Sequence, residues 1–474
     1  MDQSNKTMNE VERKQKSSQN TALAVAMITN FFSPFGASAL NIAVPHIGTE
    51  YHSTAVSLPW IVISYVLTTA LLSIPFGRVA DIYGRKPILK IGIFLFFVAS
   101  LLNIFSPNIQ LFFLFRVLQG IGAAMTFATN TAILIDVYPA SNRGSVLGIT
   151  VAAVYTGHAC GPVIGGLLTH TFGWRAIFIV LSLLAFIALI ISVTRFSKDE
   201  EQGATQKLNS SSIVLFISSL GLLMYGLVTF AQHIWSYCCL AAGAVLIVIF
   251  IKHEMRTEVP VIEVRLFSGN MEFSLSTLAA LFNFASMYAI TYLMSLYLQL
   301  ARGFTADISG LILISQPIVQ IVLSPIAGRL SDKRSPATIA SIGMACCTGA
   351  LFMFSFLDEH TPILFLIAGL LLTGVGVGLF SSPNSNVILG SVSNKDYGVA
   401  SSVLSTSRTV GQVVGMAILT IVINKVIGNI SIEHVTAGAL VRDTHISYLI
   451  FTVICGIGIL FSLKRRGKKE EGLS

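Results

Sequence analysis

Two arginines lie inside apolar stretches that are long enough to cross a membrane. Arg116 follows the run Leu111–Phe115, and Arg408 lies among small and apolar residues of a second stretch. Burying an arginine at the middle of a bilayer costs about 3 kcal/mol on insertion scales, so its side chain normally faces a partner or a cavity. The alternative for Arg116 is a side chain that extends to the nearer membrane surface. Both arginines are therefore candidates for charge-dependent chemistry.

Groups that can exchange a proton are scarce in these stretches. His158 is the only histidine deep inside one, and its unperturbed pKa of about 6.5 allows proton exchange near neutral pH. A neutral packing histidine is the alternative. No Asp or Glu falls at the centre of an expected span. Asp136 lies at the end of one span, where it is either a second proton carrier or an ordinary solvated charge. The predicted proton-coupling set is Arg116, Asp136 and His158.

A short polar loop between two apolar runs can act as a latch between helices. It carries three cations and one anion beside the membrane surface. Its candidate latch residues are Gly77, Arg78, Asp81, Gly84, Arg85 and Lys86. The pattern of its first five positions recurs at 328–332, which adds Asp332 to the set. We expect Asp81 and Asp136 to pair with Arg78 and Arg143.

Small residues at regular spacing predict a close helix contact. Gly157, Gly161 and Gly165 recur every four residues and make one smooth face. Pro162 removes one backbone hydrogen bond and kinks the helix, and Gly166 extends the small surface. We expect this stripe to be the face on which two halves of the molecule move against each other.

Amide, phenol and guanidinium groups inside the spans are candidate substrate contacts, although each is also compatible with packing between helices. These residues are Asn41, Gln119, Asn283, Tyr288, Tyr292, Gln316, Asn384, Arg408 and Gln412.

The composition is that of an integral membrane protein. Of the 474 residues, 54% are hydrophobic and 11% are charged, against about 25% charged residues in a soluble chain. Fourteen apolar segments predict an all-helical protein with both termini on one side. Most of the 30 lysines and arginines then fall on that side, which indicates that both termini are cytoplasmic. The net charge of +8 is explained by anionic lipid and does not indicate nucleic acid.

An internal repeat predicts two related halves. Gly144, Gly157 and Gly161 recur as Gly398, Gly411 and Gly415. Such halves are expected of secondary transporters, with the substrate site between them. The expected organisation is a cytoplasmic tail (1–20), a six-helix bundle (21–196), a linker with two extra helices (197–270), a second six-helix bundle (271–463) and a cytoplasmic tail (464–474).

The motifs together resemble a known family. The polar loop, Arg116 with Gln119-Gly120-Ile121-Gly122, and the stripe Gly157–Gly166 are similar to three motifs of the major facilitator superfamily. With fourteen spans, the chain resembles its 14-helix drug:proton antiporters of the QacA and EmrB kind. The resemblance implies proton coupling and gating by Arg116 and Asp81. The family's first helix usually carries an aspartate where this chain has Gly36, so the resemblance leaves the proton carrier open.

The expected function is export of small amphipathic compounds across the cytoplasmic membrane of a prokaryote, coupled to proton entry. A dedicated exporter of a metabolite, lipid or siderophore is one alternative, and a non-transporting membrane sensor or scaffold is another. No loop for ATP and no catalytic motif is present, so we expect neither an enzyme nor a cofactor or metal. The expected partners are a small-molecule substrate, protons and the lipid bilayer, and the fold permits a functional monomer.

Overall fold

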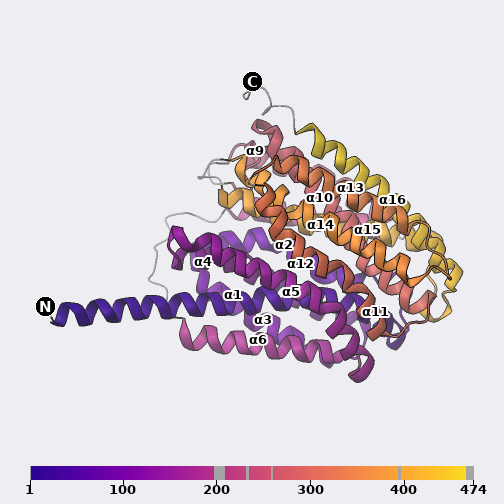
Figure 1. The fold of residues 1–474 in the computed structure, drawn as a ribbon, viewed down its shortest axis with the longest axis horizontal. Helices are drawn as coiled ribbons and strands as arrows, with labels where there is room; N and C mark the ends of the chain where they lie inside the picture. The colour runs from indigo at the N-terminus through magenta and orange to yellow at the C-terminus, as the bar shows by residue number, and fades with distance from the viewer. Residues whose placement is uncertain are drawn as a thin grey trace.

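The computed structural model describes residues 2–196, 209–230, 234–257, 260–331, 333–392 and 397–465. Within these ranges, fourteen helices are long and apolar enough to cross a membrane, which confirms the predicted all-helical fold. Residues 2–20, expected as a tail, continue the first helix toward the end of the chain marked N (Figure 1). Parts of the linker and of the C-terminal tail lie outside the described residues, as do Asp332 and the side chain of Arg143.

The spans form two bundles of six and an extra pair. The N-terminal bundle contains α1 (Asp2–Glu50), α2 (Trp60–Tyr83), α3 (Arg85–Ile104), α4 (Ile109–Val137), α5 (Ala140–Phe172) and α6 (Arg175–Arg195). The extra pair is α7 (Ser210–Val228) and α8 (Trp235–Glu254), and the short α9 (Arg265–Gly269) follows it. The C-terminal bundle contains α10 (Met271–Leu296) with η1 (Tyr297–Ala301), α11 (Ala306–Leu313) with α12 (Ser315–Ser331), α13 (Pro336–Phe354), α14 (Ile363–Gly390), α15 (Tyr397–Val426), the short η2 (Ile432–His434) and α16 (Ala437–Lys464).

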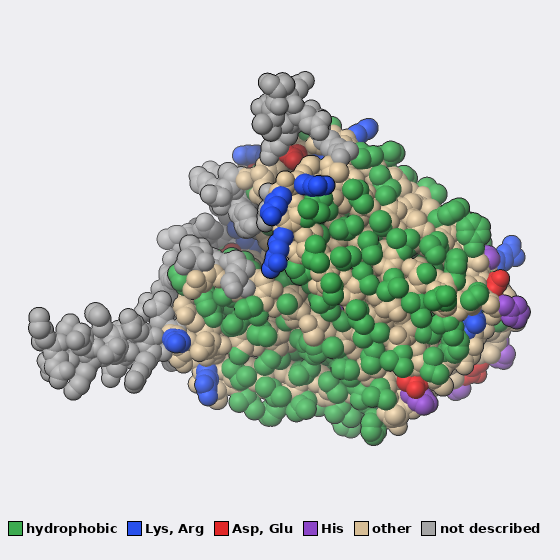
Figure 2. Space-filling model, in the orientation of Figure 1, with side chains coloured by type: hydrophobic (Ala, Val, Ile, Leu, Met, Phe, Trp, Pro, Cys, Tyr) green, Lys and Arg blue, Asp and Glu red, His purple; other side chains and the backbone are tan. Residues whose placement is uncertain are grey.

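The molecule has two ends, which correspond to the two sides of a membrane. The terminal face is the end where α1 begins and α16 ends, and the distal face is the end where α1 stops at Glu50 and α16 starts at Ala437. Between the faces, hydrophobic side chains cover the visible surface (Figure 2). Exposed apolar side chains such as Leu114 and Leu364 are stable in hydrocarbon rather than in water. The protein is therefore a multi-pass membrane protein.

The glycines give the two bundles matching contacts. A Cβ on Gly120 would lie 2.8 Å from the backbone oxygen of Tyr65 on α2, and Gly374, which lies 254 positions later, approaches the backbone of Gln316 on α12 in the same way. Gly157 packs on α1 as Gly411 packs on α10. These contacts give the predicted repeat a structural basis.

The extra pair lies beside both bundles. Helices α7 and α8 pack on each other, and α7 also contacts α2 and α15. A Cβ on Gly243 would lie 2.6 Å from the backbone of Leu223, so a bare glycine lets the two helices approach closely. The extra pair thus contacts both bundles through α7.

Candidate functional site

The two bundles are joined at the distal face by backbone hydrogen bonds. The segment after α1 and the segment before α16 pair through Ala55 N–H to Ile430 O at 2.9 Å and Ile432 N–H to Ser53 O at 3.1 Å. Beside them, the His52 ring lies 3.0 Å from the carboxylate of Glu433. We call residues 51–57 and 430–434 the distal seal. Its contacts join segments that lie far apart in the chain, with His52 and Glu433 separated by 381 positions.

Below the seal, α1 meets α10. Ser295 Oγ donates to Asn41 O at 2.8 Å, and Gln299 Nε2 donates to Ile42 O at 3.0 Å. The side-chain oxygen of Asn41 is buried and accepts no hydrogen bond. Among the described residues, the direct hydrogen bonds between the two bundles gather at this distal end. The structure is therefore closed toward the distal face.

Arg116 lies at the centre of a buried polar group in the N-terminal bundle. Its side chain is 2% exposed and donates to Ile61 O at 3.2 Å and to Gln119 Oε1. Gln119 in turn donates to Ser100 Oγ at 2.8 Å. The guanidinium carbon lies 4.4 Å from the ring centre of Tyr65, whose hydroxyl bonds to Ser33. Arg116 thus connects α2, α3 and α4 instead of extending to the membrane surface.

Arg116 and the partly buried Arg408 each also interact electrostatically with a tyrosine of the opposite bundle. Arg116 interacts electrostatically with Tyr288 of α10, and Arg408 of α15 does so with Tyr155 of α5. One nitrogen of Arg116 and the hydroxyl of Tyr288 are buried without a hydrogen-bond partner. Arg408 binds Ser385 Oγ at 2.8 Å, and its Nε has no partner. These unused donors lie where the two bundles meet.

The remaining candidate substrate contacts separate into two groups. Gln316 and Gln412 are partly buried, as is the predicted proton carrier His158, and the side chains of these three residues form no hydrogen bond within the described part of the chain. Asn283 and Asn384 are instead bound inside the C-terminal bundle. Asn283 donates to Cys347 Sγ at 3.7 Å, and Asn384 donates to Ser276 O at 3.2 Å.

Asn384 belongs to a network at the terminal face. It accepts from Arg465 Nη1 at 2.5 Å, and the other Arg465 nitrogen donates to Ser462 Oγ at 2.8 Å. Arg465 is 7% exposed, and burial lowers the pKa of its guanidinium to about 10, so it stays cationic at neutral pH. The network connects α10, α14 and α16, which is a structural role.

The latch has different partners from those expected. Arg85 binds Asp81 at 2.9 Å and Asp136 at 2.6 Å, so one arginine holds both acids. Arg78 instead donates to Pro260 O at 2.6 Å, in the segment after α8. Gly84 between α2 and α3 has φ of 95°, which favours glycine and brings Arg85 back over α2. The expected pairing of Asp81 with Arg78 is therefore wrong.

The glycine stripe has two different partners. Gly157, Gly161 and Gly165 face α1 of their own bundle, where added Cβ atoms would lie 2.5–2.6 Å from Phe31, Ser38 and Ala39. Only Gly166 and Pro162 reach the other bundle. A Cβ on Gly166 would collide with Ala306 O, and one on Gly310 of α11 would collide with Pro162 O. The expectation that the whole stripe is the face on which the two halves move is therefore wrong. Gly157, Gly161 and Gly165 share one i, i+4 face of the helix, and Gly166 points away from that face.

The sequence reasoning missed Asp443. This residue lies in α16 and is 0% exposed, and neither carboxyl oxygen has a hydrogen-bond partner. It interacts electrostatically with Tyr292 and Tyr448. The missed signal was Thr436, whose side chain caps α16 at Ala439 N and starts the helix earlier than the apolar run. Asp443 lies near the distal start of α16 rather than at its centre, but it is a fully buried acid within a span.

The motifs, the fold and the match to a family model agree. A sequence model described as "Major Facilitator Superfamily" matches residues 26–275 and 276–474. The chain belongs to the major facilitator superfamily. It is therefore a membrane transporter, and the boundary between the two matches falls within α10, the first span of the C-terminal bundle.

Several known proteins are similar to this chain over most of its length. The riboflavin transporter RibZ of Clostridioides difficile is 27% identical over 95% of this chain and 98% of its own length. The multidrug resistance protein Stp of Mycobacterium tuberculosis (strain CDC 1551 / Oshkosh) is 28% identical over 80% of this chain and 71% of its own length. The crystal structure of a D-xylose-proton symporter superposes with a TM-score of 0.66 at 14% identity, covering 94% of this chain and 97% of that one.

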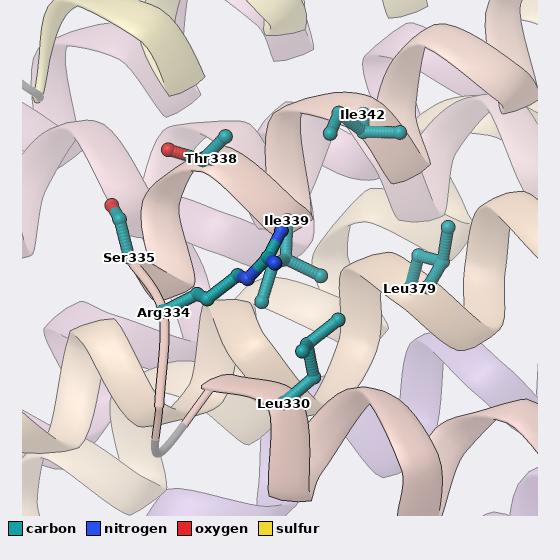
Figure 3. Close-up of a pocket in the computed structure, with 7 residues that line it drawn as sticks. All are labelled: Leu330, Arg334, Ser335, Thr338, Ile339, Ile342 and Leu379. Atoms are coloured by element: carbon teal, nitrogen blue, oxygen red, sulfur yellow. The ribbon is translucent and has the colours of Figure 1, made fainter.

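One surface cavity lies away from the candidate functional site described above. It measures about 350 Å³ and lies at the terminal ends of α12 and α13. Figure 3 shows Arg334 extending over it, with Leu330, Ile339 and Leu379 as apolar lining. It shares no residue with the distal seal or with the two buried arginines. Within the described ranges, no group of three or more His, Cys, Asp or Glu side chains could hold a metal ion.

Proposed function

We propose that this transporter exports small amphipathic compounds in exchange for protons, by alternating access across the cytoplasmic membrane of a bacterium. The observation that carries the proposal is that the buried Arg116 and the partly buried Arg408 each interact electrostatically with a tyrosine of the opposite bundle, below a closed distal seal. Moving the bundles apart changes these contacts, so a substrate or proton that binds there biases the equilibrium between the two states. One chain contains both bundles, which supports a functional monomer.

The orientation follows from the charges. Several visible lysines and arginines lie toward the terminal face, and the visible histidines lie at the opposite edge (Figure 2). Cations beside membrane spans favour the cytoplasmic side, so we assign the terminal face to the cytoplasm. The closed distal seal then faces outward, and the structure corresponds to a state that opens inward.

The substrate class follows from the central groups. Arg116 and Arg408 supply two cations, the rings of Tyr65 and Phe284 beside them supply aromatic surface, and Gly36 replaces the acid of the first helix. Such a site favours neutral or anionic amphipathic compounds over cations. His158 and Asp136 remain candidate proton carriers, and nothing in this arrangement requires an enzymatic step.

A dedicated metabolite transporter is the second candidate. The specific observation in its favour is the similarity over nearly the whole chain to a protein named as a riboflavin transporter. A non-transporting sensor or scaffold is less well supported, because both buried arginines keep unused donors at the bundle interface.

The test is transport in proteoliposomes with a lumenal pH dye. The probes are riboflavin, carboxyfluorescein and ethidium. Movement of protons on addition of a compound supports antiport, and a response to several compounds supports multidrug export. Saturable flux of riboflavin alone supports the dedicated transporter. Flux without any pH response would overturn proton coupling, and brisk ethidium export would overturn the predicted charge preference.

A further inference from the structure

Asp443 lies in a small polar island inside the C-terminal bundle. It is fully buried, and both carboxyl oxygens lack a hydrogen-bond donor. The hydroxyl of Ser447, one helical turn later, and that of Tyr292 on α10 are also buried without a partner. Three unsatisfied polar groups in one region are unusual, because buried polar groups are normally hydrogen-bonded.

Among the described residues, no cation pairs with Asp443 to neutralise a negative charge on it. The titratable groups that face it are Tyr292 on α10 and Tyr448 on its own helix, with Tyr297 of η1 next to Tyr448. Both tyrosines that face it are neutral at physiological pH. Burying an unpaired carboxylate is strongly unfavourable, whereas burying the neutral acid is much less so.

The other helices packed against α16 supply no cation to this acid. Helix α13 has cysteines as its only titratable residues. Helix α15 carries Arg408 and Lys425, and neither forms an ion pair with Asp443 in the described residues. The neighbouring His445 instead binds Leu357 O through its ring. The site therefore accommodates the protonated acid in the sealed state.

The position of Asp443 links it to the distal seal. Helix α16 starts at Ala437, directly after the seal segment that contains Ile432 and Glu433. At 1.5 Å per residue, Asp443 lies about 9 Å along the helix from its start. Separation of the seal releases the chain that holds this end of α16, which gives external water a short path to the carboxyl group.

We propose that Asp443 is a proton-binding site of the transporter, which is loaded from the distal side when the seal opens and still carries its proton in the sealed structure, before that proton leaves toward the cytoplasm. This inference rests on the proton exchange proposed above. A proton from external water forms an O–H bond with one carboxylate oxygen, and the same bond breaks when the proton leaves toward the cytoplasm. No other reactant takes part.

Infrared spectroscopy tests the protonation directly and without a substrate. Infrared spectra of the full chain in lipid nanodiscs are recorded across the range from pH 5 to pH 8. At pH 7 the native chain is expected to show a protonated-carboxyl stretch that Asp443→Asn lacks. Identical carboxyl spectra in both proteins would overturn the proposal.

Asp358→Asn is the matched control for the spectra. Asp358 is exposed, in the loop between α13 and α14, and the backbone N–H of His360 lowers the pKa of its carboxyl. The control is therefore expected to keep the pH 7 band, because Asp358 is ionised at that pH. Asn matches the neutral acid in shape, so Asp443→Asn is expected to fold, and Asp443→Glu provides a variant that retains an acid.

Transport separates this inference from the proposed function. With riboflavin, carboxyfluorescein and ethidium as probes, Asp443→Asn is expected to lose pH-driven accumulation at least tenfold while exchange without a gradient stays within twofold. Asp443→Glu is expected to restore part of the driven flux. If the native chain shows no pH-driven flux, the proposed function fails, and the spectra still decide the Asp443 site. Full pH-driven flux in Asp443→Asn, or flux driven by a sodium gradient alone, would overturn the inference.

Discussion

Arg116 shows how one side chain can fix three helices. Its guanidinium reaches Ile61 O and Gln119 and stacks on Tyr65, and Gln119 extends the network to Ser100. The planar guanidinium of arginine can make several of these contacts at once, whereas the ammonium group of a lysine is a compact point charge. Charge alone is therefore not sufficient at this position.

We expect Arg116→Lys to reduce transport more than tenfold although the positive charge remains. The lysine cannot hold Ile61 O and Gln119 together while covering the Tyr65 ring. Initial rates of probe flux in proteoliposomes with matched protein content measure the effect. Arg442→Lys, on the exposed start of α16, is the control and should keep its rate. A rate for Arg116→Lys within twofold of native would contradict this role.

Arg465 gives a prediction about stability rather than transport. Arg465→Ala removes three hydrogen bonds and leaves the buried oxygen of Asn384 without its donor. Loss of one such charged donor costs about 2 kcal/mol. We expect Arg465→Ala to have a clearly lower midpoint of thermal unfolding in detergent, measured by tryptophan fluorescence. Arg442→Ala is the control and should have an unchanged midpoint. Equal midpoints for both variants would show that the network contributes nothing.

Which residues are functional candidates was easier to predict from the sequence than which groups their side chains bind. Arg116 stood out because an arginine in an apolar run is rare in any sequence. Asn283 and Asn384 looked equivalent to cavity residues because the sequence gives no reliable direction for a side chain on an almost wholly apolar helix. Asp443 was missed because it lies before the most apolar part of α16, where a loop residue and a helix residue look alike.

At the scale of helices, small residues decide where backbones touch. Helices α5 and α11 meet at Gly166 and Gly310, which face the backbone oxygens of Ala306 and Pro162. No side chain separates the two helices there. Spacing alone predicted that the glycines of α5 pack closely, but it could not tell α1 from α11 as the partner.

We expect Gly310→Ala to weaken the closed distal state. The added methyl group collides with the carbonyl oxygen of Pro162, and backbone cannot give way as a flexible side chain can. Ser309→Cys on the same helix reports opening, because Ser309 is buried and its hydroxyl has no hydrogen bond to lose. With the native cysteines replaced, an impermeant maleimide should label it at least tenfold faster in the Gly310→Ala background.

Gly349→Ala supplies the matched control on α13. A methyl group there meets only Leu372 at 3.8 Å, which is ordinary contact. It should leave labelling at Ser309→Cys unchanged. Similar labelling rates in both alanine backgrounds would mean that the α5–α11 contact does not hold the bundles together.

At the scale of the whole molecule, periodic hydrophobicity and cation placement were enough to predict fourteen helices in two related groups. Bilayer thickness fixes the length of a span, so the pattern is strong. Which end of the molecule is closed could not be predicted. The contacts that close it are backbone hydrogen bonds between residues 53–55 and 430–432, and backbone pairing in short polar loops leaves little mark on the sequence.

The distal seal offers the strongest test of alternating access. Thr54 and Ser431 form an isolated antiparallel bridge, and the flanking bonds from Ala55 to Ile430 and from Ile432 to Ser53 make them a non-hydrogen-bonded pair. The Cα atoms of such a pair lie about 4.5 Å apart. That separation is within the range of about 4.4–6.8 Å that a disulfide spans.

We therefore expect Thr54→Cys with Ser431→Cys, in a background without native cysteines, to form a disulfide that locks the distal face. Oxidation should abolish flux, because a transporter held closed on one side cannot complete its cycle, and reduction should restore it. Each single cysteine variant is the control and should transport equally well in oxidant and reductant. Full flux through a completely crosslinked protein would mean that substrate crosses without separation of the seal, and that the bundles do not alternate in the way their contacts suggest.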